Sequence, residues 1–145
     1  MANTFTNLHY HLVFSTKNRE PFLREQKSSM HEYLGGCIRK LGATALCVGG
    51  IADHVHALVR MKPTHRLSDV LRDIKRPSSD WIQELIPSFH WQVGYSAFTV
   101  SASQIDRVCR YIERQEEHHQ KQSFEEELRE ILTVHGIEFD ERYLL

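Results

Sequence analysis

Apolar and polar residues alternate over positions 54–61, and this alternation predicts a β-strand whose two faces differ. One face carries only apolar side chains, which are Val55, Ala57, Val59 and Met61. The other face begins with two imidazoles, His54 and His56. Because the first face is the more apolar, we expect it to pack on the core and the two histidines to look outward in register.

A different period, close to that of an α-helix, runs through positions 104–119. Its buried stripe consists of four residues, Ile105, Val108, Cys109 and Ile112. Tyr111 and Gln115 lie off this stripe, about 40° apart around the helix axis. Both side chains can therefore point at one target beside the helix, and packing is the poorer explanation for the tyrosine.

The other periodic segments complete a familiar order of elements. We predict further strands at 6–16, 43–50 and 94–101, and further helices at 22–42, 67–86 and 124–134. Pro77 is expected to kink or divide the second of these helices. Strand, helix, hairpin, helix, strand is the order of an α+β, ferredoxin-like fold, an antiparallel sheet with helices on one face. In that fold the first strand lies beside the histidine strand.

Length and composition are those of one globular domain, with 145 residues, of which 41% are hydrophobic and 26% charged. Within it we distinguish a ferredoxin-like core (1–103), a C-terminal helix that carries the tyrosine (104–120) and an acidic tail (121–145). The sequence has no apolar run long enough for a membrane span or a signal peptide. Cys37, Cys47 and Cys109 are odd in number and widely spaced, which favours reduced thiols and a cytoplasmic location.

The formal charge of −1 hides a division along the chain. Residues 1–115 contain 15 Lys and Arg against 10 Asp and Glu, whereas residues 116–145 contain 3 against 9. A basic body can bind phosphates while the acidic tail packs elsewhere, limits non-specific binding, contacts another subunit or is simply solvated. Net charge therefore does not exclude a nucleic-acid partner.

Paired imidazoles on one strand face can chelate a divalent cation. Many such pairs bind nothing, and a second pair, His9 and His11, competes for the role. The spacing alone does not decide between the two pairs. His118 and His119 lie near the end of the tyrosine helix, where cations are favourable without any function, and we leave them out of the ligand set.

Taken together, these segments resemble the single-tyrosine HUH transposases of the smallest insertion sequences, whose motifs are a His-hydrophobic-His strand and a Tyr-x-x-x-Gln helix. The matching blocks run in order along most of the chain: 11–17, 53–59, Lys75 with 78–82, 94–95, 111–115 and 118–119. Several blocks in order are far more specific than either motif alone. Arg76 and Pro77 depart from the pattern by interrupting the lysine-serine block.

The resemblance implies a site and a reaction. His54, His56 and Gln115 would bind Mg²⁺ or Mn²⁺, and Tyr111 would attack a phosphodiester of single-stranded DNA beside a hairpin at an element end. The products would be a 5′-phosphotyrosine and a free 3′-hydroxyl. Relatives are homodimers, so the tyrosine helix would serve its own chain or the partner. His11 would support the site without being a ligand. The chain has no Gly-rich phosphate loop, and we expect no nucleotide cofactor.

Basic residues near the predicted strand ends and along the helix at 67–86 are candidates for phosphate contacts. They are Lys17, Arg19, Arg60, Lys62, Arg66, Arg72, Lys75 and Arg76.

Two other functions remain open from the sequence. One is a domesticated relative that processes chromosomal repeat hairpins. The other is a non-catalytic ferredoxin-like module that binds nucleic acid.

Overall fold

The computed structural model describes residues 3–144. Four antiparallel strands form one sheet in the order β2-β3-β1-β4. Their bounds are Leu8–Ser15 (β1), Thr44–Ile51 (β2), His54–Met61 (β3) and Ser96–Thr99 (β4). The histidine strand β3 pairs with β1, so the predicted neighbourhood and the ferredoxin-like strand order are confirmed.

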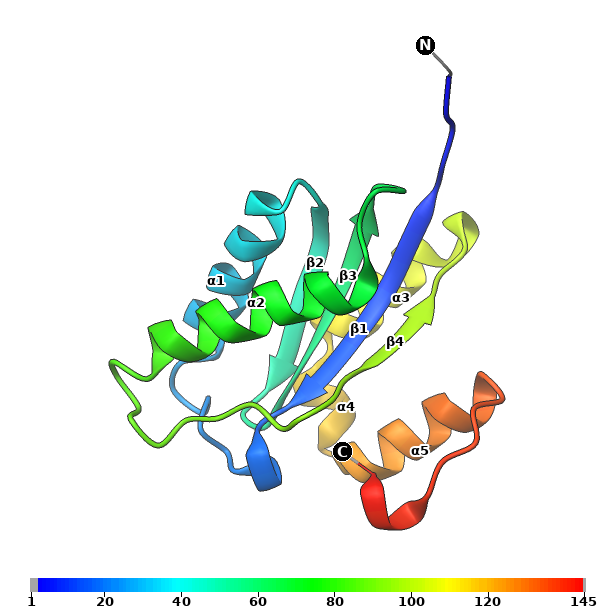
Figure 1. Cartoon of the computed structure of the whole chain (residues 1–145). Coiled ribbons are helices and arrows are strands. Elements are labelled where there is room, and N and C mark those ends of the chain that lie inside the picture. Colours follow the sequence, from blue (N-terminus) through cyan, green and yellow to red (C-terminus); the bar gives the residue numbers. More distant parts are fainter. Residues whose placement is uncertain (1–2, 145) are drawn as a thin grey trace.

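Helices cover both faces of this sheet. Helices α1 (Lys27–Lys40) and α2 (Leu67–Ile82) lie on one face, as expected for the fold. The other three helices are α3 (Ile105–Glu113), α4 (Gln115–His119) and α5 (Phe124–Val134). Figure 1 shows α1 and α2 in front of the strands and α3 and α4 behind them, with α5 beside β4. The C-terminal segment therefore adds a third layer to the two-layer core.

The main core lies between the sheet and α1 and α2. Strand residues Leu12, Phe14, Val55, Ala57 and Val59 pack there against Met30, Leu34, Ile38, Val70 and Ile74. The alternation that predicts β3 thus assigns its faces correctly, because its apolar face is the one buried in this core.

The register of β1 against β3 places the imidazole of His11 on the same face as His54 and His56. Val13 lies opposite His56 and Ser15 lies opposite His54. Since directly opposed residues point to the same side of a sheet, His11 shares the face of His54 and His56.

Some predicted helix bounds need correction. The segment at 104–119 is not one helix, because Arg114, with φ −104° and ψ 26°, leaves helical geometry and separates α3 from α4. Pro77 does not divide α2, which runs through it. The Ser78 hydroxyl, in the residue after Pro77, donates to the Ile74 carbonyl oxygen at 2.6 Å. The helix at 124–134 agrees with prediction.

The prediction of three reduced thiols is wrong for two of them. Cys47 of β2 and Cys109 of α3 form a disulfide, with Cα atoms 5.9 Å apart, and Cys37 is free. The two lie 62 residues apart, so only the docking of α3 on β2 brings them together. In the described part of the chain, no helix has the length and apolar character that crossing a membrane requires.

A close approach of backbones fixes the position of α3. A Cβ added to Gly49 of β2 would overlap the Ile112 carbonyl oxygen and come within 2.9 Å of Ile112 Cγ2. Only a residue without a side chain allows β2 and α3 to come this near.

Gly49→Ala is expected to destabilise the fold by about 1–3 kcal/mol, because the added methyl group must push α3 away from β2. Urea unfolding measures the change. Gly36→Ala in α1 is the matched control, since its Cβ would lie 3.9 Å from the nearest atom, Arg39 Nη2, and alanine favours helix. Unchanged stability of Gly49→Ala would contradict this account of how α3 is held on β2.

Candidate metal centre and nucleophile

The two histidines of β3 lie beneath a layer of helix and do not face solvent. His54 and His56 are both 0% exposed, so the expected outward orientation is wrong as regards exposure. The cause is a second, smaller core on this face, in which Phe124, Leu128 and Leu132 of α5 pack against Val13 and Phe98. Burial of this apolar stripe holds the C-terminal segment over the histidine pair.

Hydrogen bonds behind the rings orient both imidazoles. His54 Nδ1 lies 2.7 Å from Asp53 Oδ1, and His56 Nδ1 lies 2.7 Å from His11 Nε2. The Nε2 atoms of both rings are thereby left to point at a common centre. His11 occupies the supporting position that the sequence suggested, and His9, two residues before it in β1, lies opposite Arg60 toward the far end of β3.

Tyr111 and Gln115 reach the same centre from the other layer. Gln115 Oε1 lies 3.1 Å from His54 Nε2, and the Tyr111 ring centroid lies 5.7 Å from that of His56. Within one chain the structure thus brings together all four residues of the expected site: Tyr111, His54, His56 and Gln115.

Glu127 lies at the middle of this group, although the sequence analysis did not single it out. It is 2% exposed, and its Oε1 lies 3.1 Å from His56 Nε2 and 3.4 Å from His54 Nε2. Its Oε2 accepts hydrogen bonds from the Tyr111 hydroxyl and, at 3.1 Å, from Gln115 Nε2. The sequence did contain a signal for this residue, because Glu127 is a carboxylate among the apolar positions of α5.

Two histidines that were left out of the ligand set also border the centre. His119 Nε2 lies 2.9 Å from Gln115 Oε1 and 3.3 Å from Glu127 Oε1. His118 Nε2 lies 3.3 Å from Glu127 Oε2. The break at Arg114 turns α4 so that both rings come over the sheet.

The site attracts positive charge. Burial by itself would raise the pKa of Glu127, but the neighbouring His119, His54 and His56 lower it well below its usual range. Burial likewise opposes charge on His54, yet its bonds to Asp53 and Glu127 prevail and raise its pKa. Burial lowers the pKa of His11 to about 3 and that of His56 to about 4, so both are neutral at pH 7. Neutral imidazole is the form that binds metals.

These donors suit a divalent cation. The atoms of His54, His56 and Glu127 that could bind an ion lie within 4.8 Å of one another, as do those of His118, His119 and Glu127. Imidazole nitrogens with carboxylate and amide oxygens form a donor set that Mn²⁺ accepts readily and Mg²⁺ tolerates.

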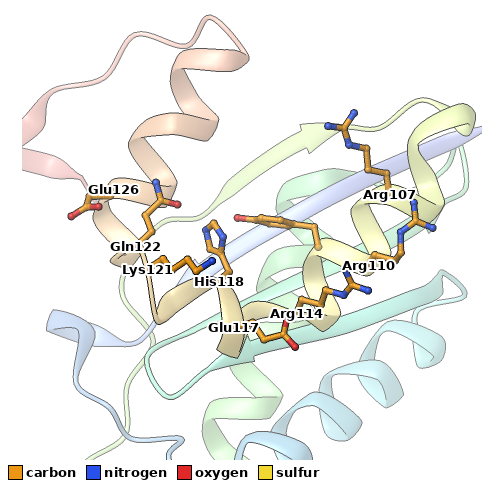
Figure 2. A pocket seen from close by; sticks show the side chains of 9 residues that line it. Arg107, Arg110, Arg114, Glu117, His118, Lys121, Gln122 and Glu126 are labelled. Carbon is orange, nitrogen blue, oxygen red and sulfur yellow. The ribbon is translucent and has the colours of Figure 1, made fainter.

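A basic hollow adjoins the tyrosine. It is lined by Arg107, Arg110 and Tyr111 of α3, Arg114 between α3 and α4, Glu117 and His118 of α4, and Lys121, Gln122 and Glu126 at the start of α5 and just before it. Figure 2 shows Arg107 and Arg110 of α3 and Arg114 just after it on one side, and His118 and Lys121 on the other. The arginines were missed, although the spacing of Arg107 and Arg114 from Tyr111 is that of side chains on one helix face.

The basic residues chosen from the sequence are scattered. Arg72 and Arg76 lie on α2, on the opposite face of the sheet from the histidines, and Arg72 pairs with Asp69 and Asp73. Arg60 lies near the end of β3 that is farther from His54, and Lys62 and Arg66 follow that end. Lys17 and Arg19 lie at the nearer end, where Arg19 pairs with Glu125. Lys75 donates to the carbonyl oxygens of Gln92 and Gly94.

Sequence comparison gives the family. The family model described as "Transposase IS200 like" matches residues 4–115, most of the chain. The chain belongs to the IS200-like transposase family. It is therefore a transposase by descent, as the resemblance in its motifs suggested.

Solved structures share the fold of this IS200-like transposase. A candidate transposase from Deinococcus radiodurans is 23% identical, with a TM-score of 0.65 over 79% of this chain and 95% of its own. A REP-associated tyrosine transposase bound to a REP hairpin is 13% identical, with a TM-score of 0.57 over 77% of this chain and 68% of its own. No curated protein sequence matches the chain.

Lys75 is expected to act in folding. Burial lowers the pKa of its ammonium group to about 8, so it still carries charge at pH 7, bonded to Gln92 O at 2.8 Å and Gly94 O at 2.7 Å. Lys75→Met leaves both carbonyls without this donor and should cost about 1–3 kcal/mol in urea unfolding. Arg76→Gln, one residue along and exposed, should change stability by less than about 0.5 kcal/mol. Equal effects of the two variants would contradict this assignment.

Proposed function

We propose that this IS200-like transposase cleaves and rejoins single-stranded DNA through a covalent tyrosine intermediate. The observation that carries the proposal is the position of Tyr111, which lies beside His54, His56 and Gln115 in the same chain, next to the basic hollow on α3. A nucleophile, a cation site and a surface for phosphates are the three parts that such a reaction needs.

In the proposed step, the Tyr111 oxygen forms a bond to the phosphorus of one phosphodiester, and the bond from phosphorus to the 3′ oxygen breaks. The phenol proton passes to solvent, and the departing 3′ oxygen takes up a proton to become a free 3′-hydroxyl. The 5′ end remains on the protein as phosphotyrosine. Attack by a 3′-hydroxyl reverses the step, so rejoining needs no nucleotide cofactor.

We assign His54, His56 and Gln115 to binding Mg²⁺ or Mn²⁺. When bound, the cation polarises the scissile phosphate and stabilises the leaving 3′ oxygen. Asp53 and His11 hold the two imidazoles in the orientation that this binding requires.

Tyr111 is protonated in the resting protein. Burial and the adjacent Glu127 raise the pKa of its phenol well above the usual value. The arginines beside it supply positive charge that favours the approach of a phosphate and the development of negative charge on the phenol oxygen. Attack is therefore expected only when a DNA phosphate lies beside these arginines.

We infer that the substrate is single-stranded DNA next to a hairpin. The similar structure of a REP-associated tyrosine transposase is bound to a REP hairpin, which supports this class of substrate. The same relative favours a second candidate, a domesticated enzyme that processes repeat hairpins with the same chemistry. A homodimer remains a prediction, and the residues of the proposed site already meet within one chain.

Tyr111→Phe is expected to abolish the covalent adduct, because no oxygen remains to attack phosphorus. Wild type should form a denaturant-resistant protein–DNA band with a hairpin-bearing strand from the DNA that flanks its gene, and the variant should lose it by at least about 10³-fold. Hairpin binding should stay within about twofold. Tyr143→Phe, which alters an exposed tyrosine, is the matched control. An adduct with Tyr111→Phe would refute the proposed role, as would no adduct with wild type.

Removal of arginine charge from α3 or from α2 distinguishes which of two basic surfaces binds DNA. The double variant Arg107→Gln/Arg110→Gln removes two charges beside Tyr111 and should weaken single-strand binding. The slope of log K against log salt concentration should become shallower by about 0.7 for each phosphate that the variant no longer neutralises. Arg72→Gln/Arg76→Gln removes the same charge from α2 and should leave both quantities nearly unchanged. Fluorescence anisotropy at several salt concentrations makes the measurement. A larger effect from the α2 pair would place the DNA on the other face of the sheet.

A further inference from the structure

Glu127 is unusual for its position on α5. Phe124, Leu128 and Leu132 form the buried stripe of this helix, and Glu127 lies among them with 2% of its surface exposed. Glutamate is almost never buried to this degree unless it is paired, because an ionised carboxylate loses its hydration. Something positive must therefore compensate it.

The atoms around Glu127 do not supply that charge in their neutral forms. His54 Nδ1 faces the Asp53 carboxylate and His119 Nδ1 faces the Gln122 carbonyl oxygen, each at 2.7 Å, and both oxygens only accept hydrogen bonds. The single hydrogen of each neutral ring is thus on Nδ1, and Nε2 presents a lone pair.

These lone pairs point at other acceptors. Gln115 Oε1 lies 3.1 Å from His54 Nε2 and 2.9 Å from His119 Nε2. Glu127 Oε1 lies 3.4 Å from His54 Nε2 and 3.3 Å from His119 Nε2. With neutral rings no hydrogen lies between these atoms, and they would repel one another unless a cation were among them.

Their separations are those of ligands around one ion. At a metal–ligand bond length of about 2.1 Å, neighbouring donors lie about 3.0 Å apart in an octahedron and about 3.4 Å apart in a tetrahedron. The four separations above, and the 3.1 Å between His56 Nε2 and Glu127 Oε1, cover the same range.

We propose that Glu127 Oε1 and His119 Nε2 complete the cation site formed by His54, His56 and Gln115. This inference rests on the cation of the proposed function and adds two ligands to it. Both come from beyond residue 115, where the match to the family model ends. The acidic tail is then part of the metal centre.

The other oxygen of Glu127 contacts the proposed nucleophile. Oε2 accepts the hydrogen bond of the Tyr111 hydroxyl, while Oε1 faces the cation side. One rigid carboxylate therefore sets the position of the phenol relative to the ion.

The test is the affinity of the full-length, DNA-free protein for Mn²⁺, measured from the EPR signal of the free ion. Glu127→Gln and His119→Ala should each weaken Mn²⁺ binding by at least about tenfold. Glu138→Gln removes the same charge from an exposed residue of the tail outside the site and should stay within about twofold. His54→Ala serves as the reference for removal of a ligand already assigned.

Wild-type affinity, or tighter binding, in folded Glu127→Gln would overturn the proposal while leaving the cleavage chemistry intact. Where Glu127→Gln does not fold, as judged by circular dichroism, unchanged affinity in His119→Ala would overturn it. If the wild-type protein does not bind Mn²⁺, the proposed cation site is refuted, and the two added ligands with it. The adduct assay with Tyr111→Phe reports separately on the nucleophile, so the two failures are distinguishable.

Discussion

Acceptor atoms of Gln115, Glu127, His54 and His119 all point into one small volume on the second face of the sheet. Such an arrangement is stable only when positive charge is present, either as protons on the imidazoles or as a metal ion. That requirement explains why the pKa of His54 is raised although the ring is buried. It also explains how a carboxylate can lie inside an apolar helix stripe.

The position of the tyrosine depends on how tightly α3 is fixed to β2. Gly49 admits the Ile112 backbone to close range, and the Cys47–Cys109 disulfide joins the same two elements one turn earlier on the helix. The break at Arg114 then turns α4 toward the histidines. These constraints together let one chain hold a phenol and paired imidazoles around a common centre.

Ion pairs between the basic body and the acidic C-terminal segment explain the uneven charge along the chain. Acidic residues of the C-terminal segment pair with basic residues of the body, Glu125 with Arg19 and Glu116 with Lys27, and Glu127 enters the site itself. The tail is therefore attached to the histidine face and is not merely solvated. Because the acidic groups are used in this way, the arginines of α3 remain exposed beside Tyr111.

Local periodicity in the sequence was enough to determine most of the elements, and the resemblance of its motif blocks indicated the family. Alternation fixed both the bounds and the faces of β3, and a helical period fixed α5, because these patterns depend only on neighbouring residues. The motif residues His54, His56, Tyr111 and Gln115 were found in the same way. The roles assigned to them depend on the family resemblance.

Only the tertiary structure decided which distant residues contact these motif residues. Glu127 lies 71 positions from His56, and Cys47 lies 62 from Cys109, so both contacts depend on the path of the chain across the second face of the sheet. The same path buried the histidines that alternation alone had placed toward solvent, and it set Arg72 and Arg76 on the far side of the sheet from Tyr111. A sequence pattern specifies which side of its own element a residue occupies, but the partner of that side is chosen by packing between elements.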